Sequence, residues 1–309
     1  RIGKAVLESI RESGVGLADV AAVGLGSPGI LDYREGTMVN PTNFPGWTDF
    51  PIRDRIAHHC GLPVVLANDA SAAAYGEFWI GSGKGFRSMV MLTLGTGVGC
   101  GVIVNDLIIE GENGHGAECG HIIIDPADDA RVCSCGHTGH LEAYASATGV
   151  VARTKEAMDS GRPTSLFKRI ADGAPLTPLT IAEEAEAGDE LSLEIVLETA
   201  RCLGIGIVTL LHAIDPSGVL IGGAMAYTFD RGGIGDRFLE RVRQEVARRA
   251  FPILAERTRI DFATLGPDAG FIGAAGIARV EHHRMLRSRG LAPSPGEDNH
   301  ATRHVDRDP

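Results

Sequence analysis

Residues 92–104 read Leu-Thr-Leu-Gly-Thr-Gly-Val-Gly-Cys-Gly-Val-Ile-Val, two apolar runs separated by closely spaced glycines. The runs predict two strands joined by a hairpin, and successive exposed N–H groups at its glycines would form an anion-binding surface. Thr96 adds a hydroxyl donor. The stretch is not a P-loop, because no Gly-Lys-Ser/Thr follows. It indicates either a phosphate-binding turn at Gly95, Thr96, Gly97 and Gly99 or a tight hairpin with bulges.

Outward from this hairpin, short apolar runs ended by Gly, Pro or Asn alternate with longer helical patterns, which is typical of α/β architecture. Strands are predicted over 22–25, 64–67, 88–94, 101–104 and 218–221. Helices are predicted over 2–13, 52–59, 70–79, 141–157, 191–214, 238–250 and 269–285. From about residue 287 the composition turns polar, which predicts a disordered tail over 287–309.

Two pairs of residues follow predicted strands. Asn68 and Asp69 precede an alanine-rich helix, where either is a common N-cap. The carboxyl end of a strand is also where ligands collect, so Asp69 is a candidate to accept a proton from a substrate hydroxyl, with Asn68 binding a neighbouring one. Both readings hold if one residue caps and the other points outward. Gly222 and Gly223 would permit close approach of a flat base or sugar, although many such turns look alike.

Residues 133–142 read Cys-Ser-Cys-Gly-His-Thr-Gly-His-Leu-Glu, and Glu118-Cys-Gly-His121 lies about a dozen residues before them. The two thiols are not spaced as the Cys-x-x-Cys of a redox centre. Two thiolates, His140 and a nearby imidazole are a ligand set that tetrahedral zinc prefers, and the alternative is a polar loop. Such a zinc ion would have no open position for a substrate, so the site would be structural.

Composition narrows the class of protein. The chain has 309 residues and a net charge of −11, which argues against a binder of nucleic-acid phosphates. No run of about 18 apolar residues predicts a membrane span, and no secretory signal is visible. Six cysteines, unevenly placed, fit a reducing, cytoplasmic compartment better than a disulfide framework.

Taken in order, the motifs resemble the ROK family of sugar kinases, within the actin-like ATPase superfamily. The matching stretches are Gly26-Ser-Pro-Gly29, Asn68-Asp69, Leu94-Gly-Thr-Gly-Val-Gly99, Glu118-Cys-Gly-His121 and Cys133 to Glu142. Residues 40–47, Asn-Pro-Thr-Asn-Phe-Pro-Gly-Trp, also resemble the sugar-side loop of bacterial glucokinases in this family. The resemblance extends from about residue 20 to about residue 280.

The resemblance implies a role for each matched residue. Asp69 would be the general base toward the sugar 6-hydroxyl, with other sugar contacts from Gly29, Asn43, Asn68, Glu118, His121 and Glu142. ATP phosphates would lie at Gly95, Thr96, Gly97 and Gly99, and the adenosine beside Gly222 and Gly223. The implied cofactors are ATP, Mg²⁺ and a structural Zn²⁺ held by His121, Cys133, Cys135 and His140. The zinc would stiffen the loops that carry the sugar contacts.

Two departures from the family pattern matter. His140 stands where the family has a third zinc cysteine, which implies a Cys2His2 site, with His137 as the other candidate for the last ligand. The family's Asp-x-Gly-Gly-Thr turn would lie before Arg1. We therefore expect the first strands of the small domain to be missing from this chain, and the chain alone to be poorly active.

The implied fold is α/β: an actin-like ATPase (ribonuclease H-like) fold of two domains around a cleft. The small domain would comprise residues 1–72 and the returning helix 267–285, and the large domain residues 73–266 with the zinc knuckle. The family resemblance also implies a homodimer. No membrane partner is expected.

The predicted activity is ATP-dependent phosphorylation of a hexose, first of all glucose. N-acetylmannosamine, N-acetylglucosamine, fructose and allose are alternative substrates. A sugar-responsive ROK transcriptional repressor is the alternative from another class, and the acidic charge and Asp69 favour the kinase.

Overall fold

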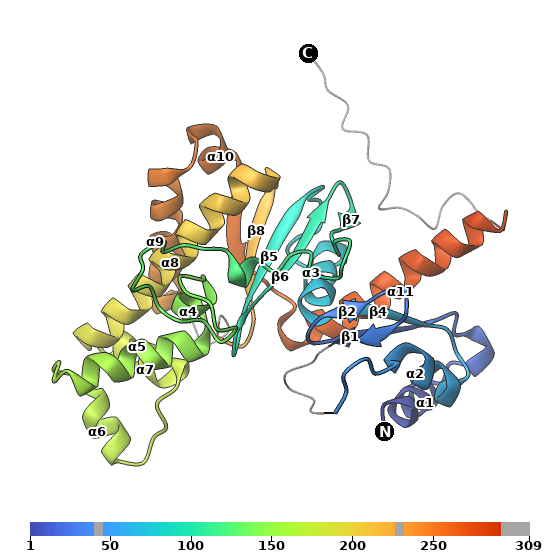
Figure 1. Cartoon of the computed structure of the whole chain (residues 1–309), viewed down its shortest axis with the longest axis horizontal. Coiled ribbons are helices and arrows are strands. Elements are labelled where there is room, and N and C mark those ends of the chain that lie inside the picture. Colours follow the sequence, from blue (N-terminus) through green and yellow to red (C-terminus); the bar gives the residue numbers. More distant parts are fainter. Residues whose placement is uncertain (40–45, 226–231, 292–309) are drawn as a thin grey trace.

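The computed structural model describes residues 1–39, 46–225 and 232–291. Its largest sheet has five strands in the order β7-β6-β5-β8-β9 (Figure 1). They are β5 (Met89–Leu94), β6 (Val98–Val104), β7 (Leu107–Ile108), β8 (Gly218–Gly222) and β9 (Arg259–Phe262). β5, β8 and β9 run parallel, whereas β6 is antiparallel to both its neighbours. Leu94 pairs with Val98, so the glycine-rich stretch is a hairpin, as predicted.

Both faces of this sheet are buried. Successive side chains of a strand point to opposite faces. Val90 and Leu92 of β5 accordingly pack in a core with α8 (Glu190–Ile214) and α9 (Ile234–Arg249). Met89 and Met91 pack instead with α3 (Asp69–Trp79) and α11 (Ala269–Ser288). In Figure 1, α8 and α9 lie on one side of the sheet and α3 on the other. Burial on both faces explains the nearly continuous apolar sequence of the strand.

Helix α8 is long and apolar enough, by length and composition, to cross a membrane. Of its most apolar 18-residue window, 61% is buried inside the structure, however. The helix is also the centre of the larger core, where Leu203, Ile207 and Leu211 are completely or almost completely buried. These contacts explain its apolar character as that of a core helix.

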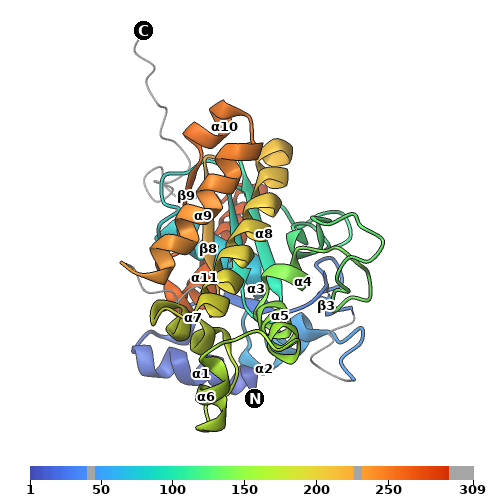
Figure 2. The ribbon, with the colours of Figure 1, turned by 90° about the vertical axis from the view of Figure 1, so that its left-hand side faces the viewer.

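The second lobe contains a smaller parallel sheet of β1 (Val23–Ser27) and β4 (Val64–Asn68). A short antiparallel pair, β2 (Leu31–Asp32) and β3 (Thr37–Met38), follows β1. Helices α1 (Ile2–Ser13) and α2 (Ile52–Cys60) pack on each other and on this lobe (Figure 2). Leu31, Met38, Ile52, Ile56 and Leu66 belong to its separate core.

Helices α3 and α11 lie between the two sheets. α11 packs on β1 and β4, α3 packs on β5 and β6, and the two helices pack on each other. Glycines make their close approach possible, since a Cβ at Gly273 would stand 1.6 Å from the carbonyl oxygen of Ala72. The proposed boundary between the domains, at residue 72, thus falls within a helix that contacts both lobes.

The remaining helices cover the large lobe. They are α4 (Glu142–Ala145), α5 (Ala147–Asp159), α6 (Leu166–Ala171), α7 (Pro178–Glu186) and α10 (Pro252–Arg257). Among the residues that the structure describes, 3₁₀ turns span Leu17–Asp19, Cys119–His121 and Gly266–Asp268.

Several boundaries differ from the sequence-based expectation. The single helix predicted over 141–157 is two helices, because Ser146 is extended and caps α5 by accepting a hydrogen bond from the Gly149 N–H at 3.0 Å. β6 begins at Val98 instead of residue 101, since its glycines pair within the ladder. α11 continues to Ser288, past the predicted start of the tail. β2, β3 and β7 were not predicted because two residues carry no periodicity.

Candidate active site and metal centre

The β4–α3 junction separates the roles of Asn68 and Asp69. Asn68 is the N-cap of α3: its Oδ1 accepts hydrogen bonds from the N–H groups of Ala70 (2.9 Å) and Ser71 (3.2 Å). Its Nδ2 donates to the carbonyl oxygen of Gly29 at 3.4 Å. The acceptor of Asn68 is therefore engaged, and only its amide N–H is left to reach a ligand.

Asp69 is the member of the pair that faces outward. Its side chain is exposed, and its Oδ1 accepts a hydrogen bond from the Ala70 N–H at 2.9 Å. Partial desolvation by neighbouring protein atoms raises the pKa of this carboxyl above its ordinary 3.8. The adjacent residue, Ala70, packs against the glycine-rich strand, since a Cβ at Gly99 would stand 2.9 Å from the Ala70 Cβ. Asp69 thus lies where the small lobe meets the glycine turn.

The glycine turn is held by helix α5. The N–H of Ala147 donates to the carbonyl oxygen of Gly95 (2.8 Å), and the hydroxyl of Thr148 donates to that of Thr96 (2.8 Å). Within the turn, the Gly95 N–H donates to the carbonyl oxygen of Gly97 at 3.0 Å. These hydrogen bonds attach the turn to the start of helix α5. They could not be predicted from the sequence because they depend on tertiary packing.

Gly222 and Gly223 lie directly beside this turn. Gly222 pairs with Thr93 at the carboxyl end of β5. Gly223 has a φ of +90°, and a Cβ there would stand 2.4 Å from the backbone nitrogen and oxygen of Leu94. The structure therefore brings both predicted glycine clusters to the carboxyl ends of adjacent parallel strands, the usual ligand-binding edge of such a sheet.

Glu142, a predicted sugar contact, is tied to the glycine turn. Its Oε2 accepts a hydrogen bond from the Val98 N–H at 3.0 Å, and a Cβ at Gly97 would stand 2.3 Å from that oxygen. Its Oε1 accepts hydrogen bonds from the Ser134 hydroxyl (2.5 Å) and the Cys133 thiol (3.4 Å). One carboxylate thus joins the cysteine-rich knuckle to the turn. Ser134 was not singled out from the sequence, and no local pattern marks it.

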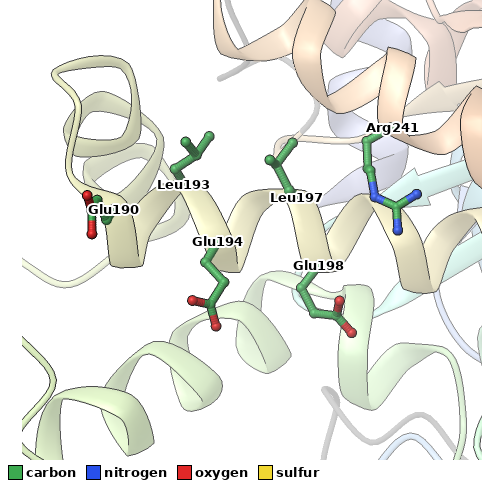
Figure 3. Close-up of a pocket in the computed structure, with 6 residues that line it drawn as sticks. All are labelled: Glu190, Leu193, Glu194, Leu197, Glu198 and Arg241. Atoms are coloured by element: carbon green, nitrogen blue, oxygen red, sulfur yellow. The ribbon is translucent and has the colours of Figure 1, made fainter.

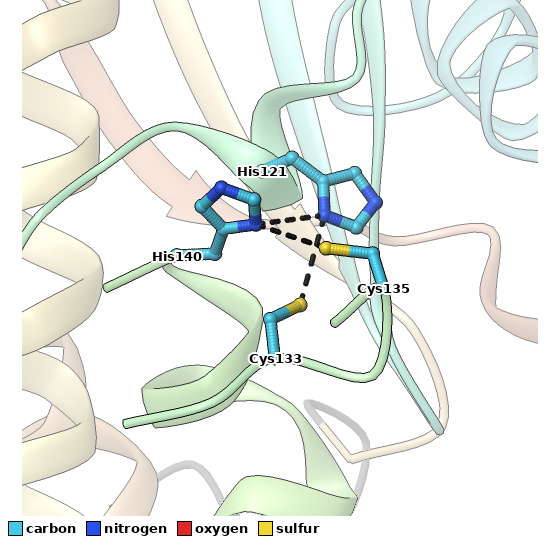
Figure 4. Close-up of side chains that lie close together, drawn as sticks. All are labelled: His121, Cys133, Cys135 and His140. Atoms are coloured by element: carbon cyan, nitrogen blue, oxygen red, sulfur yellow. Dashed lines mark hydrogen bonds between the residues drawn. The ribbon is translucent and has the colours of Figure 1, made fainter. Parts of the chain in front are cut away.

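His121, Cys133, Cys135 and His140 form one cluster, whose four candidate ligand atoms lie within 4.8 Å of one another (Figure 4). The two Nδ1 atoms of His121 and His140 are 3.3 Å apart. The Cys133 Sγ lies 3.7 Å from the His121 Nδ1, and the Cys135 Sγ lies 3.2 Å from the His140 Nδ1.

These three distances are close to those between ligand atoms of a tetrahedral zinc ion. With Zn–N of about 2.0 Å and Zn–S of about 2.3 Å, neighbouring ligand atoms stand about 3.3–3.8 Å apart. His140 belongs to the converging group, whereas His137 is exposed and only its Nδ1 approaches the Cys135 Sγ, at 3.7 Å. The geometry therefore favours His140 as the fourth candidate ligand.

The knuckle itself is a tight turn. The Cys133 N–H donates to the carbonyl oxygen of His137 at 2.7 Å, and the Gly136 N–H donates to that of Cys133 at 2.9 Å. Burial raises the pKa of the Cys133 thiol to about 11, and burial together with the neighbouring His121 lowers the pKa of His140. A bound divalent cation would instead lower the pKa of the Cys133 thiol, because it favours the thiolate.

Glu118 and His121 are placed by the 3₁₀ turn Cys119–His121. The Nδ1 of His121 points into the cluster, and its Nε2 lies 3.9 Å from the Glu118 Oε2. One imidazole can therefore serve both predicted roles through different nitrogens. Gly29, with a φ of +82°, lies beside Asn68. Asn43 lies outside the described residues.

Tyr33 was not identified from the sequence. Burial and the nearby carboxylate of Glu110 raise the pKa of Tyr33 to about 12, although the neighbouring backbone of Asn68 acts to lower it. Tyr33 and Glu110 line a cavity of about 410 Å³ between β4 and α11. Tyr33 thus lies next to the predicted site, and no signal in the sequence distinguishes it from an ordinary turn residue.

A separate groove of about 360 Å³ lies on α8, away from these residues (Figure 3). It is lined by Glu190, Leu193, Glu194, Leu197, Glu198 and Arg241. Glu194 is paired with Arg162 and Glu198 with Arg201, so these carboxylates already have partners. The groove does not contribute to the candidate site.

Comparison with known proteins shows the family of this chain. A model of the ROK family matches residues 1–281. The glucokinase of Halalkalibacterium halodurans is 36% identical over 87% of this chain and 79% of its own length. A crystal structure of a ROK family glucokinase from Streptomyces griseus, in complex with glucose and AMPPNP, is 32% identical. It matches with a TM-score of 0.74 over 90% of this chain and 88% of that chain. The xylose repressor of Caldicellulosiruptor bescii is 30% identical over 82% of this chain and 61% of its own length.

Proposed function

Because this chain belongs to the ROK family, we propose that it is an ATP-dependent sugar kinase whose first substrate is glucose. The observation that carries the proposal is the position of Asp69: an outward-facing carboxyl with a raised pKa, one residue from the contact between Ala70 and Gly99. A candidate base thus stands beside a candidate phosphate-binding turn. Similarity to glucokinases supports the choice of sugar.

In the proposed reaction, Asp69 accepts the proton of the sugar 6-hydroxyl as that oxygen attacks the γ-phosphorus of ATP. The bond from the γ-phosphorus to the oxygen that bridges it to the β-phosphate breaks, and ADP leaves. Phosphoryl transfer depends chiefly on positioning and charge stabilisation, so a single base beside a phosphate site suffices. The ATP phosphates would lie at Gly95, Thr96, Gly97 and Gly99, where the Gly95 N–H already donates to the carbonyl oxygen of Gly97 and would have to exchange that partner to bind a phosphate oxygen. Gly222 and Gly223 would lie beside the adenosine. Mg²⁺, when bound with ATP, would neutralise charge on the phosphates.

The sugar would be oriented by the polar groups of the candidate site. Glu118, the Nε2 of His121 and the amide N–H of Asn68 would bind its hydroxyls, and Gly29 would line the pocket. A polyol suits such a set because each hydroxyl both donates and accepts. Glu142 would reach a sugar hydroxyl by exchanging one of its present partners.

Zinc is proposed as a structural element of this site. Held by His121, Cys133, Cys135 and His140, it would fix the loop that carries His121 and the turn that carries Ser134 and Glu142. All four positions of a tetrahedral ion would be filled by protein, so no step of the reaction is assigned to it. A homodimer, a cytoplasmic location and the absence of membrane and nucleic-acid partners remain part of the proposal.

The second candidate, a sugar-responsive repressor, is favoured by the similarity to the xylose repressor. The two functions differ in one assay. We would incubate full-length protein with ATP and a panel of glucose, N-acetylmannosamine, N-acetylglucosamine, fructose and allose, and identify products by phosphorus NMR.

Phosphate transfer to the 6-hydroxyl, fastest with glucose, is expected. Sugar binding without any transfer would contradict the kinase and support the repressor. Faster turnover of another sugar in the panel would show that glucose is not the first substrate, and the kinase proposal itself would stand.

A further inference from the structure

Glu77, near the end of α3, is a completely buried carboxylate. Its Oε1 accepts hydrogen bonds from the backbone N–H groups of Thr264 (2.7 Å) and Leu265 (2.5 Å). Its Oε2 accepts from the N–H of Ser82 (2.8 Å), the Ser82 hydroxyl (2.8 Å) and the Thr264 hydroxyl (3.2 Å). Five donors therefore converge on a single side chain.

Neutral donors alone stabilise this charge in the described part of the chain, where Glu77 forms no ion pair. A buried carboxylate is costly unless hydrogen bonds replace its lost hydration, and five of them meet that need. Gly81 keeps the space open, since a Cβ there would stand 2.2 Å from the Glu77 Oε2. The carboxylate therefore holds together two backbone segments between which the described residues form no direct backbone hydrogen bond.

The two anchored segments are the chain connections between the α3–α11 pair and the five-stranded sheet. Ser82 lies between α3 and β5, and Thr264–Leu265 lie between β9 and α11. Any movement of one lobe relative to the other must bend or rotate these connections. Glu77 holds both of them with one carboxylate.

The same helix carries the proposed base. Asp69 begins α3 and Glu77 lies eight residues later, about 12 Å along a rigid helix. Between them, Ala70 and Ala74 pack on Gly99 and Gly101 of the glycine-rich strand. The position of Asp69 relative to the phosphate turn is thus determined by how α3 is fixed at both ends.

We propose that Glu77 is a positioning residue that fixes the Asp69 helix to both interlobe connections. This inference rests on the proposed kinase function. Loss of the anchor would misplace Asp69 relative to the phosphate turn and slow phosphoryl transfer, while the proposed contacts to ATP and to the sugar, which lie outside α3, are retained. Small misplacements of this kind have large effects on rate.

The test compares Glu77→Gln with Glu245→Gln in full-length protein. Glu245 in α9 is also completely buried, but it is paired with Arg241 and Arg249 and lies outside the candidate site. We expect Glu77→Gln to lower kcat about ten-fold or more with the KM for glucose changed less than about three-fold. Glu245→Gln should lower Tm at least as much and leave kcat within about two-fold of the wild type.

Equal kcat for Glu77→Gln and the wild type, or an equal loss of kcat in both variants, would overturn the inference. If Glu77→Gln does not fold, Ser82→Ala removes one donor and keeps the backbone bond. A kcat about three-fold lower at constant KM is then expected, and an unchanged kcat is the opposing result. A wild type without sugar-kinase activity would overturn the proposed function and this inference together, whereas an active wild type isolates the inference.

Discussion

At the scale of single residues, the account depends on the division of labour between Asn68 and Asp69. Asn68 uses its side-chain oxygen to cap α3, whereas the side chain of Asp69 is exposed one residue before the contact between Ala70 and Gly99. The sequence alone allowed either residue to be the cap. The structure resolves that alternative because Oδ1 of Asn68 accepts from both Ala70 and Ser71.

The pH dependence of the reaction follows from the pKa of Asp69. A general base must be deprotonated, so kcat/KM should fall as pH decreases through the pKa of its carboxyl. Since desolvation raises that pKa above 3.8, the acidic limb should lie above pH 3.8. The measurement is a pH–rate profile of the wild type, and a rate constant that stays level to below pH 3.8 would contradict the assignment.

The raised pKa of Asp69 also predicts how the substitution Asp69→Asn affects the stability of the protein. A carboxyl with a raised pKa binds its proton more tightly when folded, so its charged form opposes folding at neutral pH, and stability increases as pH falls through that pKa. Removing the charge should therefore leave Tm unchanged or raise it. A fall of more than about 3 °C, on the order of 1 kcal/mol for a chain of this size, would contradict this reading.

Gly97 offers a test of the phosphate turn. A Cβ at this position would stand 2.3 Å from the Glu142 Oε2, so Gly97→Ala should displace either the turn or the carboxylate. We expect the KM for ATP to rise about ten-fold or more, measured by ADP release. Gly270→Ala is the matched control, because Gly270 has open space around it and lies in helix α11. An equal change in the KM for ATP in both variants would contradict the proposal that this turn binds the ATP phosphates.

At the scale of elements, the knuckle over 133–142 joins the metal cluster to the glycine turn. Glu142 begins α4, and its carboxylate bonds both Ser134 and Val98. A loose knuckle would leave Glu142 without a fixed position, so the proposed metal would act on substrate binding through this residue as well as through His121.

The zinc proposal predicts different outcomes for two neighbouring histidines. His140→Ala removes one of four converging ligands, so zinc content should fall well below about one ion per chain, with a lower Tm. His137→Ala should keep both near the wild-type values. Elemental analysis and thermal melts provide the measurement. Zinc retained in His140→Ala but lost in His137→Ala would reverse the assignment, and a folded, active, metal-free wild type would refute it.

How far the elements could be predicted depended on their length and neighbours. The buried strand β5 and the long helix α8 carry many apolar residues in sequence, and both were located within one residue at each end. β9 alternates only Arg-Ile-Asp-Phe, too short a pattern to stand out. The break at Ser146 was missed because it depends on a cap within an otherwise helical pattern.

At the scale of the whole molecule, motifs that are far apart in the sequence lie close together in the structure. The glycine turn, Gly222–Gly223 and the Asn68–Asp69 junction are far apart in sequence, yet they meet where the two lobes join. Motif order predicted this assembly through family resemblance. The contacts of Tyr33, Ser134 and Glu77 could not be predicted in the same way, because each joins segments whose pairing has no local signature.

The most direct test of the central claim compares ADP release from ATP and glucose by full-length wild type and Asp69→Asn. The account predicts glucose-dependent turnover by the wild type and a kcat lower by about a hundred-fold or more in the variant, since general-base catalysis contributes on that scale. Glucose binding, measured by calorimetry, should change little. Turnover by Asp69→Asn close to the wild-type rate would show that Asp69 is not the base and would contradict the account.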